Sequence, residues 1–444
     1  MRLFVFRIWL AAILALSLGS LAQAADETGM FRANPAHTGV YSGSAITDTP
    51  VLKWKFHTGG RVIATPAIEH GVAYFGSTDG NMYAVDAGTG RQLWKFKTKA
   101  RIVASAAVSN GIVFFGSYDG NFYALDSATG TLKWKFATAG ERRFSGTHLH
   151  GSLPENEVMP DPFDFFMSSP VVWKGTVYFG SGDGNVYALN SADGTTKWTF
   201  NTGNVVHASP AIGDGTLFIG SWDSYFYALD AATGAEKWRF KTGDDPVIHN
   251  QVGIQSSAAI AGGIVYFGCR DSKLYALDEH TGKQVWAMNN DGSWVIASPA
   301  VRDGVLYTAT SDSGKFYALD ARTGAQIFSL DFKHWPTFSS PAVVGNMVYV
   351  GSHTGKLFGI DTSTHSVRWE FATDGAHANG ATYTNADGTP NYAPAFNENF
   401  YDALIVGVDR MMSVGAVLSS PVPYKGDIYF GSMDGNLYAL SSGK

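Results

Sequence analysis

The chain has almost no cysteine, and this excludes a disulfide-stabilised fold. Cys269 is the single cysteine among 444 residues, so no disulfide can form within the chain. Charged residues make up only 16% of the sequence, whereas hydrophobic residues make up 45%. Stability must therefore come from a buried apolar core.

Long hydrophobic runs are also absent, except near the N-terminus, where residues 8–18 are uncharged and largely apolar. This run is about half of the roughly twenty residues that span a bilayer. It follows two arginines and precedes the small residues Ala22 and Ala24, which is the order of a signal peptide. We expect residues 1–24 to be cleaved after Ala24 and the protein to be periplasmic or secreted. Because no cysteine stands at the cleavage point, we expect no lipid anchor, and no later segment is predicted to span a membrane.

Positive charge is in deficit. The sequence holds 32 Lys and Arg against 38 Asp and Glu, and residues 1–24 contain two of the arginines, which leaves a net charge of −8 after cleavage. Nucleic-acid binding depends on neutralising phosphates with basic side chains. We therefore expect no nucleic-acid partner.

One sequence pattern is repeated eight times along the chain. Its best copy is residues 105–136, SAAVSNGIVFFGSYDGNFYALDSATGTLKWKF, and successive copies start 40 to 48 residues apart, except for two intervals of 64 and 80. A period near 40 is typical of the blades of a β-propeller. The copies begin at Thr65, Ser105, Ser169, Ser209, Ser257, Ser298, Ser340 and Ser420.

Each copy except the last holds four short runs rich in Val, Ile, Phe and Tyr, separated by turn residues such as Asn-Gly and Thr-Gly. These predict four antiparallel strands joined by hairpins, which we name A to D from the axis outward. The last copy lacks a strand D, and residues 51–59 match one. We therefore expect an all-β, eight-bladed propeller over residues 51–444, closed by its N-terminal strand, with residues 25–50 as an extension.

The tryptophans mostly belong to this scaffold. A large ring at one position of strand D can pack between neighbouring blades while its N–H bonds to nearby backbone. Phe328 takes this place in blade six. The others are Trp54, Trp94, Trp134, Trp198, Trp238, Trp286 and Trp369.

Function is expected where the copies differ from one another. Strand direction alternates, so the B–C turns and the D-to-A crossings emerge on one face, which we call the working face. Two insertions in these crossings, residues 139–168 and 374–418, predict an ordered cover over that face. A shorter one, residues 243–256, joins blades four and five.

Two positions of the repeat single out blades four and five. Two residues before each copy begins, near the axis, six copies are apolar, but these blades have His207 and Gln255. In the B–C turn they carry Trp222 and Arg270. Such a set could orient an anionic or sugar-like ligand. The alternative is a polar network that fills a wide channel without binding anything.

The candidate ligand-binding residues come from these two positions, the adjoining turn and the crossing between the two blades. They are His207, Trp222, Asp223, His249, Asn250, Gln251, Gln255 and Arg270. A secondary group on the same face is Arg142, Arg143, His148, Trp294, Trp335 and His353. No spacing in the sequence predicts a metal site or a hydrolase triad.

An aspartate recurs in register in the B–C turns. Such a residue is expected to cap its turn by accepting local backbone N–H groups, and the D-x-D-x-D-G spacing of a calcium loop is missing. Among these residues, a ligand role stays open for Asp223 and Asp271, because of their neighbours. The column is Asp79, Asp119, Asp183, Asp223, Asp271 and Asp434.

The repeat Tyr-Ala-Leu-Asp-x-x-Thr-Gly-x-x-x-Trp is intact at residues 123–134 and 227–238. It resembles the PQQ-type propeller repeat shared by quinoprotein alcohol dehydrogenases and the outer-membrane assembly lipoprotein. The resemblance covers nearly the whole mature chain and implies the propeller fold. For the dehydrogenases it also implies PQQ with calcium as the cofactor.

The sequence therefore leaves two functions open. The favoured one is a non-catalytic binding or interaction protein of the cell envelope, whose working face holds a small polar ligand, a glycan or an envelope protein. The alternative is a PQQ- and calcium-dependent dehydrogenase of an alcohol or sugar, in which Trp222 stacks on the quinone and Arg270 pairs with its carboxylates. Against it, Cys269 stands alone where such enzymes have an adjacent cysteine pair, and no Cys-x-x-Cys-His haem motif occurs.

Overall fold

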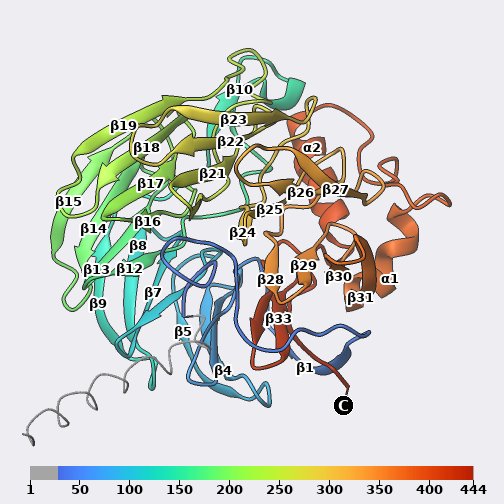
Figure 1. The fold of residues 1–444 in the computed structure, drawn as a ribbon, viewed down its shortest axis with the longest axis horizontal. Helices are drawn as coiled ribbons and strands as arrows, with labels where there is room; N and C mark the ends of the chain where they lie inside the picture. The colour runs from blue at the N-terminus through green and yellow to red at the C-terminus, as the bar shows by residue number, and fades with distance from the viewer. Residues whose placement is uncertain (1–28, 444) are drawn as a thin grey trace, which may run out of the picture.

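The computed structural model describes residues 29–443, so the predicted signal peptide lies outside the described residues. Eight four-stranded antiparallel sheets are arranged around a common axis (Figure 1). The first strands of neighbouring blades contact one another, which places them innermost. The prediction of an eight-bladed propeller is confirmed.

The strands of each blade follow one another in sequence from the axis outward, except in blade eight. Blades one to four are β2 (Ala67–Glu69), β3 (Val72–Gly76), β4 (Asn81–Asp86) and β5 (Gln92–Lys97); β6 (Ala107–Ser109), β7 (Ile112–Ser117), β8 (Asn121–Asp126) and β9 (Leu132–Ala137); β12 (Val171–Trp173), β13 (Thr176–Gly180), β14 (Asn185–Asn190) and β15 (Thr196–Asn201); and β16 (Ala211–Gly213), β17 (Thr216–Gly220), β18 (Tyr225–Asp230) and β19 (Glu236–Lys241). Blades five to eight are β20 (Ala259–Ala261), β21 (Ile264–Gly268), β22 (Lys273–Asp278) and β23 (Gln284–Asn289); β24 (Ala300–Arg302), β25 (Val305–Ala309), β26 (Lys315–Asp320) and β27 (Gln326–Asp331); β28 (Ala342–Val344), β29 (Met347–Gly351), β30 (Lys356–Asp361) and β31 (Ser366–Ala372); and β32 (Val422–Tyr424), β33 (Asp427–Gly431) and β34 (Asn436–Ser441), completed by β1 (Val51–His57).

The ring is closed by pairing of the two ends of the propeller. Strand β1 pairs antiparallel with β34, with Trp54 opposite Ala439 and Phe56 opposite Leu437. Without β1, strand β34 would present an unpaired edge. The expected closure by the N-terminal strand is therefore confirmed.

A second closed ring runs around the axis and consists of hydrogen bonds. The residue that begins each copy donates its backbone N–H to the side-chain hydroxyl of the next blade, for example Thr65 to Ser105 at 3.0 Å. The last link joins Ser420 to Thr65 at 2.9 Å. The hydroxyl at this position of the repeat therefore satisfies a buried backbone donor in every blade.

The tryptophan column joins the blades at their outer ends. Six of the seven indole N–H groups donate to a backbone carbonyl of the next blade, as Trp94 does to Ser127 at 2.9 Å. Trp369 of blade seven donates instead to the carbonyl of Ile46, which precedes the propeller, at 3.0 Å. Each of these six rings lies against the glycine of the C–D turn in the next blade, where a Cβ on Gly130, for example, would stand 2.7 Å from the Trp94 ring. In blade six, Phe328 takes the place of the tryptophan and stacks on His365, 4.4 Å between ring centres. The predicted structural role of this column is confirmed.

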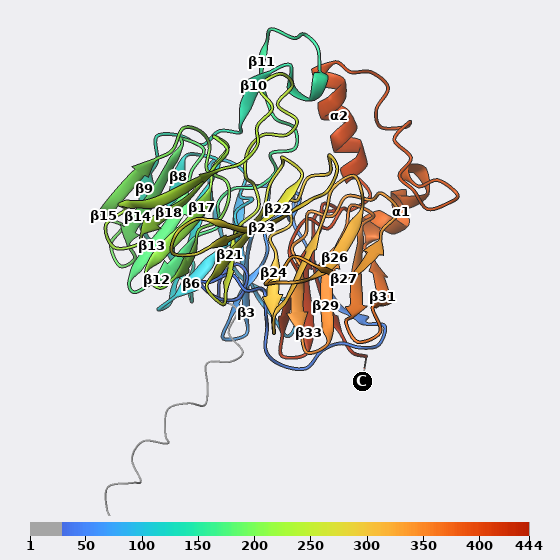
Figure 2. The same ribbon diagram turned by 45° about the horizontal axis from the view of Figure 1, so that its top comes forward.

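The two insertions form one roof on the working face. Residues 139–168 contain the hairpin β10 (Ser145–Thr147) and β11 (Val158–Pro160), and residues 374–418 contain α1 (Asp374–Tyr383) and α2 (Tyr401–Met412). Figure 2 shows β10, β11 and α2 standing together on the same side of the blades. They are joined by backbone hydrogen bonds, from Leu153 to Asn399 and from Tyr401 to Leu153. Neither α-helix in residues 29–443 is long and apolar enough to cross a membrane.

Residues 29–41 run across the opposite end of the axis. Backbone N–H groups of five inner strands donate to carbonyls of this segment. The guanidinium of Arg32 is fully buried there and donates to the carbonyls of Pro299 and Pro341, and burial lowers the pKa of Arg32 to about 10. The donors and acceptors are Val108 to Gly29, Ile212 to Pro35, Ile260 to Ala36, Val301 to Thr38 and Val343 to Gly39.

Candidate functional site

The axial channel is narrow. The residue two positions before each repeat start lines it in all eight blades, His207 and Gln255 included, as expected from the sequence. Only about 40 Å³ remains between Phe31 of the N-terminal segment and Phe166 and Met167 of the first insertion. Segments of the chain itself therefore fill most of the channel.

His207 is held by two carboxylates of the first insertion. Its Nδ1 donates to Asp164 and its Nε2 donates to Glu141, both at 2.7 Å. Burial alone would lower the pKa of His207, but the two carboxylates outweigh it and raise the pKa to about 10. The crossing before β16 and the insertion are thus joined by a buried, charged imidazolium.

Arg270 occupies a buried position between two indole rings. Its guanidinium carbon lies 4.7 Å from the centre of the Trp222 ring and 3.9 Å from that of Trp294. Its Nη1 donates to Asp161 of the first insertion at 3.0 Å, and both side chains are 0% exposed. Burial by itself would raise the pKa of Asp161, but Arg270 and His150 hold it well below its usual range.

Trp222 is covered on its other side. The Phe144 ring of the insertion stacks on it, 4.4 Å between centres and 9° from parallel, and leaves Trp222 1% exposed. The Nε1 atoms of Trp222 and Trp294, and Nε and Nη2 of Arg270, have no hydrogen-bond acceptor among the described residues. Because these buried donors lack an acceptor, a ligand role for Trp222 and Arg270 remains a prediction.

The crossing between blades four and five also contacts the insertion. His249 Nδ1 donates to the Thr147 carbonyl at 3.1 Å, and Asn250 lies 2.9 Å from His150. Gln255 donates to Asp164 and to the Phe163 carbonyl. Gln251 is half-buried, and no hydrogen bond of its side chain joins this network.

Asp223 behaves like the rest of its column. It accepts the Gly203 N–H at 2.7 Å, the Tyr225 N–H at 2.8 Å and the Tyr227 hydroxyl at 2.7 Å. The corresponding carboxylate in blade one, Asp79, makes the same three contacts. These contacts join the B–C turn to the preceding crossing and are those of a turn cap.

The secondary candidates do not form a single group. Trp335 donates its indole N–H to Gly388 of the second insertion at 3.0 Å. His353 is buried against the Phe338 ring, and burial lowers its pKa to about 3. Arg142 is exposed, and His148 lies 4.0 Å from Glu155. Arg143 alone lines the cavity described next, while Trp294 belongs to the Arg270 cluster.

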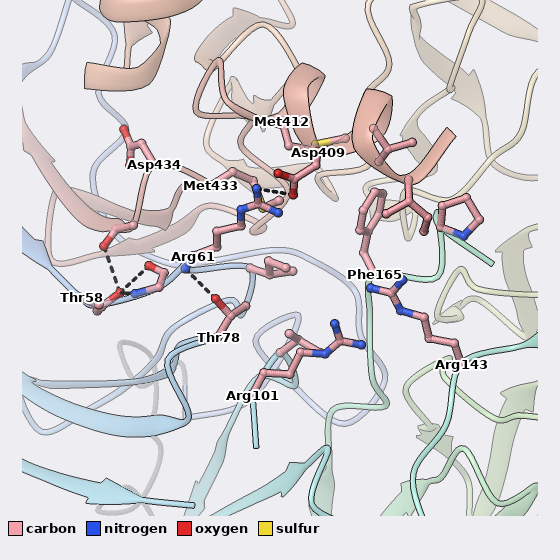
Figure 3. Close-up of a pocket in the computed structure, with 18 of the residues that line it drawn as sticks. Thr58, Arg61, Thr78, Arg101, Arg143, Phe165, Asp409, Met412, Met433 and Asp434 are labelled. Carbon is pink, nitrogen blue, oxygen red and sulfur yellow. Dashed lines mark hydrogen bonds and ion pairs between the residues drawn. The ribbon is translucent and has the colours of Figure 1, made fainter. Parts of the chain in front are cut away.

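A cavity of about 540 Å³ lies at the meeting point of blades eight, one and two with the roof (Figure 3). Its walls come from the crossings before β2 and β6, the B–C turns of blades one and eight, the first insertion and α2. It reaches the surface beside Asp409, whose side chain is 60% exposed. A volume of this size is typical of a small-molecule site.

Three arginines line this cavity. Arg61 pairs with Asp409 of α2 at 2.5 Å. Arg101 lies 3.9 Å from the centre of the Tyr118 ring, and Arg143 comes from the first insertion. Figure 3 shows the guanidinium groups of Arg101 and Arg143 extending toward the same open space. No carboxylate in residues 29–443 pairs with either of them.

The sequence reasoning missed Arg61 and Arg101. Both stand four residues before their repeat start, where the other six blades have Phe165, Val205, Gly253, Trp294, Pro336 and Ala416. Arginine at this position occurs only in blades one and two. Comparison of this third column would have identified both residues.

A family model described as "Outer membrane protein assembly factor BamB" matches residues 42–152, 166–292 and 259–444. The chain belongs to this family. No curated protein matches the sequence. The family match agrees with the PQQ-type repeat recognised from residues 123–134.

Solved structures share the fold of this BamB-family chain at low identity. BamB from Moraxella catarrhalis is 15% identical with a TM-score of 0.63, covering 88% of this chain and 100% of its own. Quinohemoprotein alcohol dehydrogenase from Comamonas testosteroni is 15% identical with a TM-score of 0.68, covering 94% and 81%. A europium-containing methanol dehydrogenase is 14% identical with a TM-score of 0.67, covering 94% and 98%. At such identity the likeness concerns the fold alone.

The residues assigned to a quinone do not fit one in this BamB-family structure. Both faces of the Trp222 ring are taken, by Phe144 and by Arg270, and Arg270 is paired with Asp161. No group of three or more His, Cys, Asp or Glu side chains within residues 29–443 could hold a metal ion. No catalytic step through PQQ or calcium can be built on these residues.

Proposed function

We propose that this protein is a non-catalytic binding protein of the cell envelope, and that its ligand enters the roofed cavity at blades eight, one and two. The observation that carries the proposal is the cavity of about 540 Å³, which combines charged side chains with a buried apolar wall. Ligand sites commonly have this combination, because apolar walls supply affinity and a few polar groups supply orientation.

The envelope location rests on two arguments. The predicted signal peptide would export the chain, and the family match is to an outer-membrane assembly factor. The net charge of −8 expected after cleavage disfavours a nucleic-acid partner.

In this proposal the polar groups of blades four and five bind the roof rather than the ligand. His207 and Arg270 each pair with carboxylates of the first insertion. These contacts fix the insertion, and with it Arg143 and Phe165, over the cavity. A ligand under such a roof is a small molecule or a short segment of a larger one, since a folded partner would meet the roof first.

Two neighbouring residues of α2 offer a matched test. Ile405 lines the cavity, whereas Val406 is 44% exposed on the outside of the helix. We expect Ile405→Trp to fill the cavity and abolish ligand binding, and Val406→Trp to leave it unchanged. The measurement is a thermal-shift titration with sugars, sugar acids, cell-wall fragments, and PQQ with calcium.

The outcomes separate the two functions. A ligand that stabilises the wild type and the Val406→Trp variant but not the Ile405→Trp variant, without turnover, supports the proposal. Binding that survives Ile405→Trp would place the site elsewhere and overturn it. Stabilisation by PQQ with calcium, together with dye-linked oxidation of an alcohol or sugar, would establish the dehydrogenase instead.

A further inference from the structure

We infer that the cavity takes a small organic anion, a carboxylate or phosphate ester with an apolar body, whose charged group is bound by Arg101 and Arg143. This inference rests on the proposed function, because it assigns a ligand class to the same cavity. It goes further in naming two residues that recognise the charge.

Around the cavity, the guanidinium groups of Arg101 and Arg143 have no ion-pair partner among the described residues. Arg61 is neutralised by Asp409. Asp434 accepts the Gly375 N–H and the Tyr438 hydroxyl, as its turn requires. Arg101 and Arg143 have no such carboxylate within the described residues. A guanidinium without a carboxylate partner presents several N–H donors to an incoming anion.

Arg101 is held in a geometry that suits binding. Its guanidinium stacks on the Tyr118 ring, 3.9 Å from the ring centre. Stacking uses the flat face of the group and leaves the N–H bonds in its plane free to donate. The ring also limits the rotamers of the side chain, so less conformational entropy is lost when an anion binds.

Arg143 supplies a second, independent sign of a missing acceptor. Its Nε is buried and has no hydrogen-bond partner within residues 29–443. A buried donor without an acceptor costs free energy, which an acceptor brought by a ligand would recover. The position of Arg143 at the cavity wall places this donor beside the space that the ligand would fill.

The opposite wall defines the rest of the ligand. Side chains of Ile63, Val103, Phe165, Met412 and Met433 line the cavity, and all five are buried. Inorganic phosphate or sulfate would leave this wall without a contact. An anion with an aromatic or aliphatic group covers it and gains binding free energy from apolar burial.

Arg142 provides a matched control for the charge. It is adjacent to Arg143 in the same insertion, carries the same charge, is exposed, and does not line the cavity. The variants are Arg101→Gln, Arg143→Gln, the double variant and Arg142→Gln in the mature protein. The probes are phenyl phosphate and benzyl alcohol, a neutral molecule that carries the same phenyl ring, titrated by calorimetry.

We expect the wild type to bind phenyl phosphate more tightly than benzyl alcohol. Arg101→Gln and Arg143→Gln should each weaken phenyl phosphate binding about tenfold, whereas Arg142→Gln should change it less than about twofold. Benzyl alcohol binding should be the same in all four variants. Ile405→Trp should abolish binding of both probes.

The experiment distinguishes failure of the anion inference from failure of the proposed function. If the double variant binds phenyl phosphate as the wild type does, while Ile405→Trp does not bind it, the anion inference is wrong and the cavity remains the site. If Arg142→Gln weakens binding as much as Arg143→Gln, the effect is one of net charge, and the inference is also wrong. If neither probe binds the wild type, the anion inference is wrong, whereas the proposed function is still decided by the panel of sugars, sugar acids and cell-wall fragments. If both probes bind Ile405→Trp unchanged, the cavity is not the site, and the proposed function fails together with the inference.

Discussion

Arginine side chains on two sides of the working face, at blades five and two, differ in pairing and exposure. At blade five, Arg270 is 0% exposed, stacked between two indoles and paired with Asp161. At blade two, Arg101 stacks on one ring, has no carboxylate partner among the described residues and borders a cavity of about 540 Å³. Under the proposed function, an unusual residue in a repeat marks a ligand site only where its charge is unpaired and space adjoins it. Elsewhere it indicates a contact within the protein.

The largest effect is expected from Asp161→Ala. This substitution leaves the buried guanidinium of Arg270 without its counter-charge, and breaking a buried ion pair costs about 3–5 kcal/mol. Urea denaturation followed by circular dichroism would measure the loss in free energy of unfolding. Glu157→Ala, at an exposed position of the same insertion, should change it by less than about 0.5 kcal/mol. An Asp161→Ala variant as stable as the wild type would mean that water reaches Arg270, and the contrast between the two sides would be lost.

Trp222→Ala tests the same side through its aromatic contacts. The ring is 1% exposed and packs against Phe144 and Arg270. We expect a loss of about 3 kcal/mol in free energy of unfolding, because a large buried ring is removed. Binding of phenyl phosphate at the cavity should persist. A variant that keeps full stability but loses ligand binding would instead support the site predicted from the sequence at blades four and five.

A smaller effect, dependent on pH, is expected at His207. Its pKa of about 10 in the folded protein lies above the unfolded value of about 6.5. Its stabilisation is therefore fully present below pH 6.5 and is lost as the pH rises toward 10. His207→Gln should cost about 2 kcal/mol at pH 6 and much less at pH 10. Urea denaturation of both proteins at pH 6, 8 and 10 would measure this.

His353 gives the matched contrast in the opposite direction. Burial lowers its pKa to about 3, so it stays neutral in the folded protein while the unfolded chain binds a proton below about pH 6.5. Its contribution disfavours the folded state as the pH falls from 6.5 toward 3. His353→Phe should reduce this loss of stability at acid pH and leave the stability at alkaline pH unchanged.

A His207→Gln variant with the same pH dependence as the wild type would show that the buried imidazolium does not fix the roof.

Much of the scaffold could be predicted from the sequence, because each blade repeats the same local interactions. The hydroxyl at each repeat start, the tryptophan of strand D and the aspartate of the B–C turn bond to groups fixed by the repeat itself. Strand β1 was assigned to the last blade because residues 51–59 match a strand D. Such interactions are periodic, so comparison of the copies reveals them.

The sequence by itself determined the ring, its closure and the face on which the chain departs from the repeat. It also drew attention to His207 and Arg270, but their partners Glu141, Asp161 and Asp164 lie in an insertion that has no counterpart in other copies. Only the tertiary structure decided that these charges meet one another while Arg101 and Arg143 face open space. The physical reason is that pairing and burial depend on which non-repeating segments fold back over the blades, and a one-dimensional pattern carries no record of that contact.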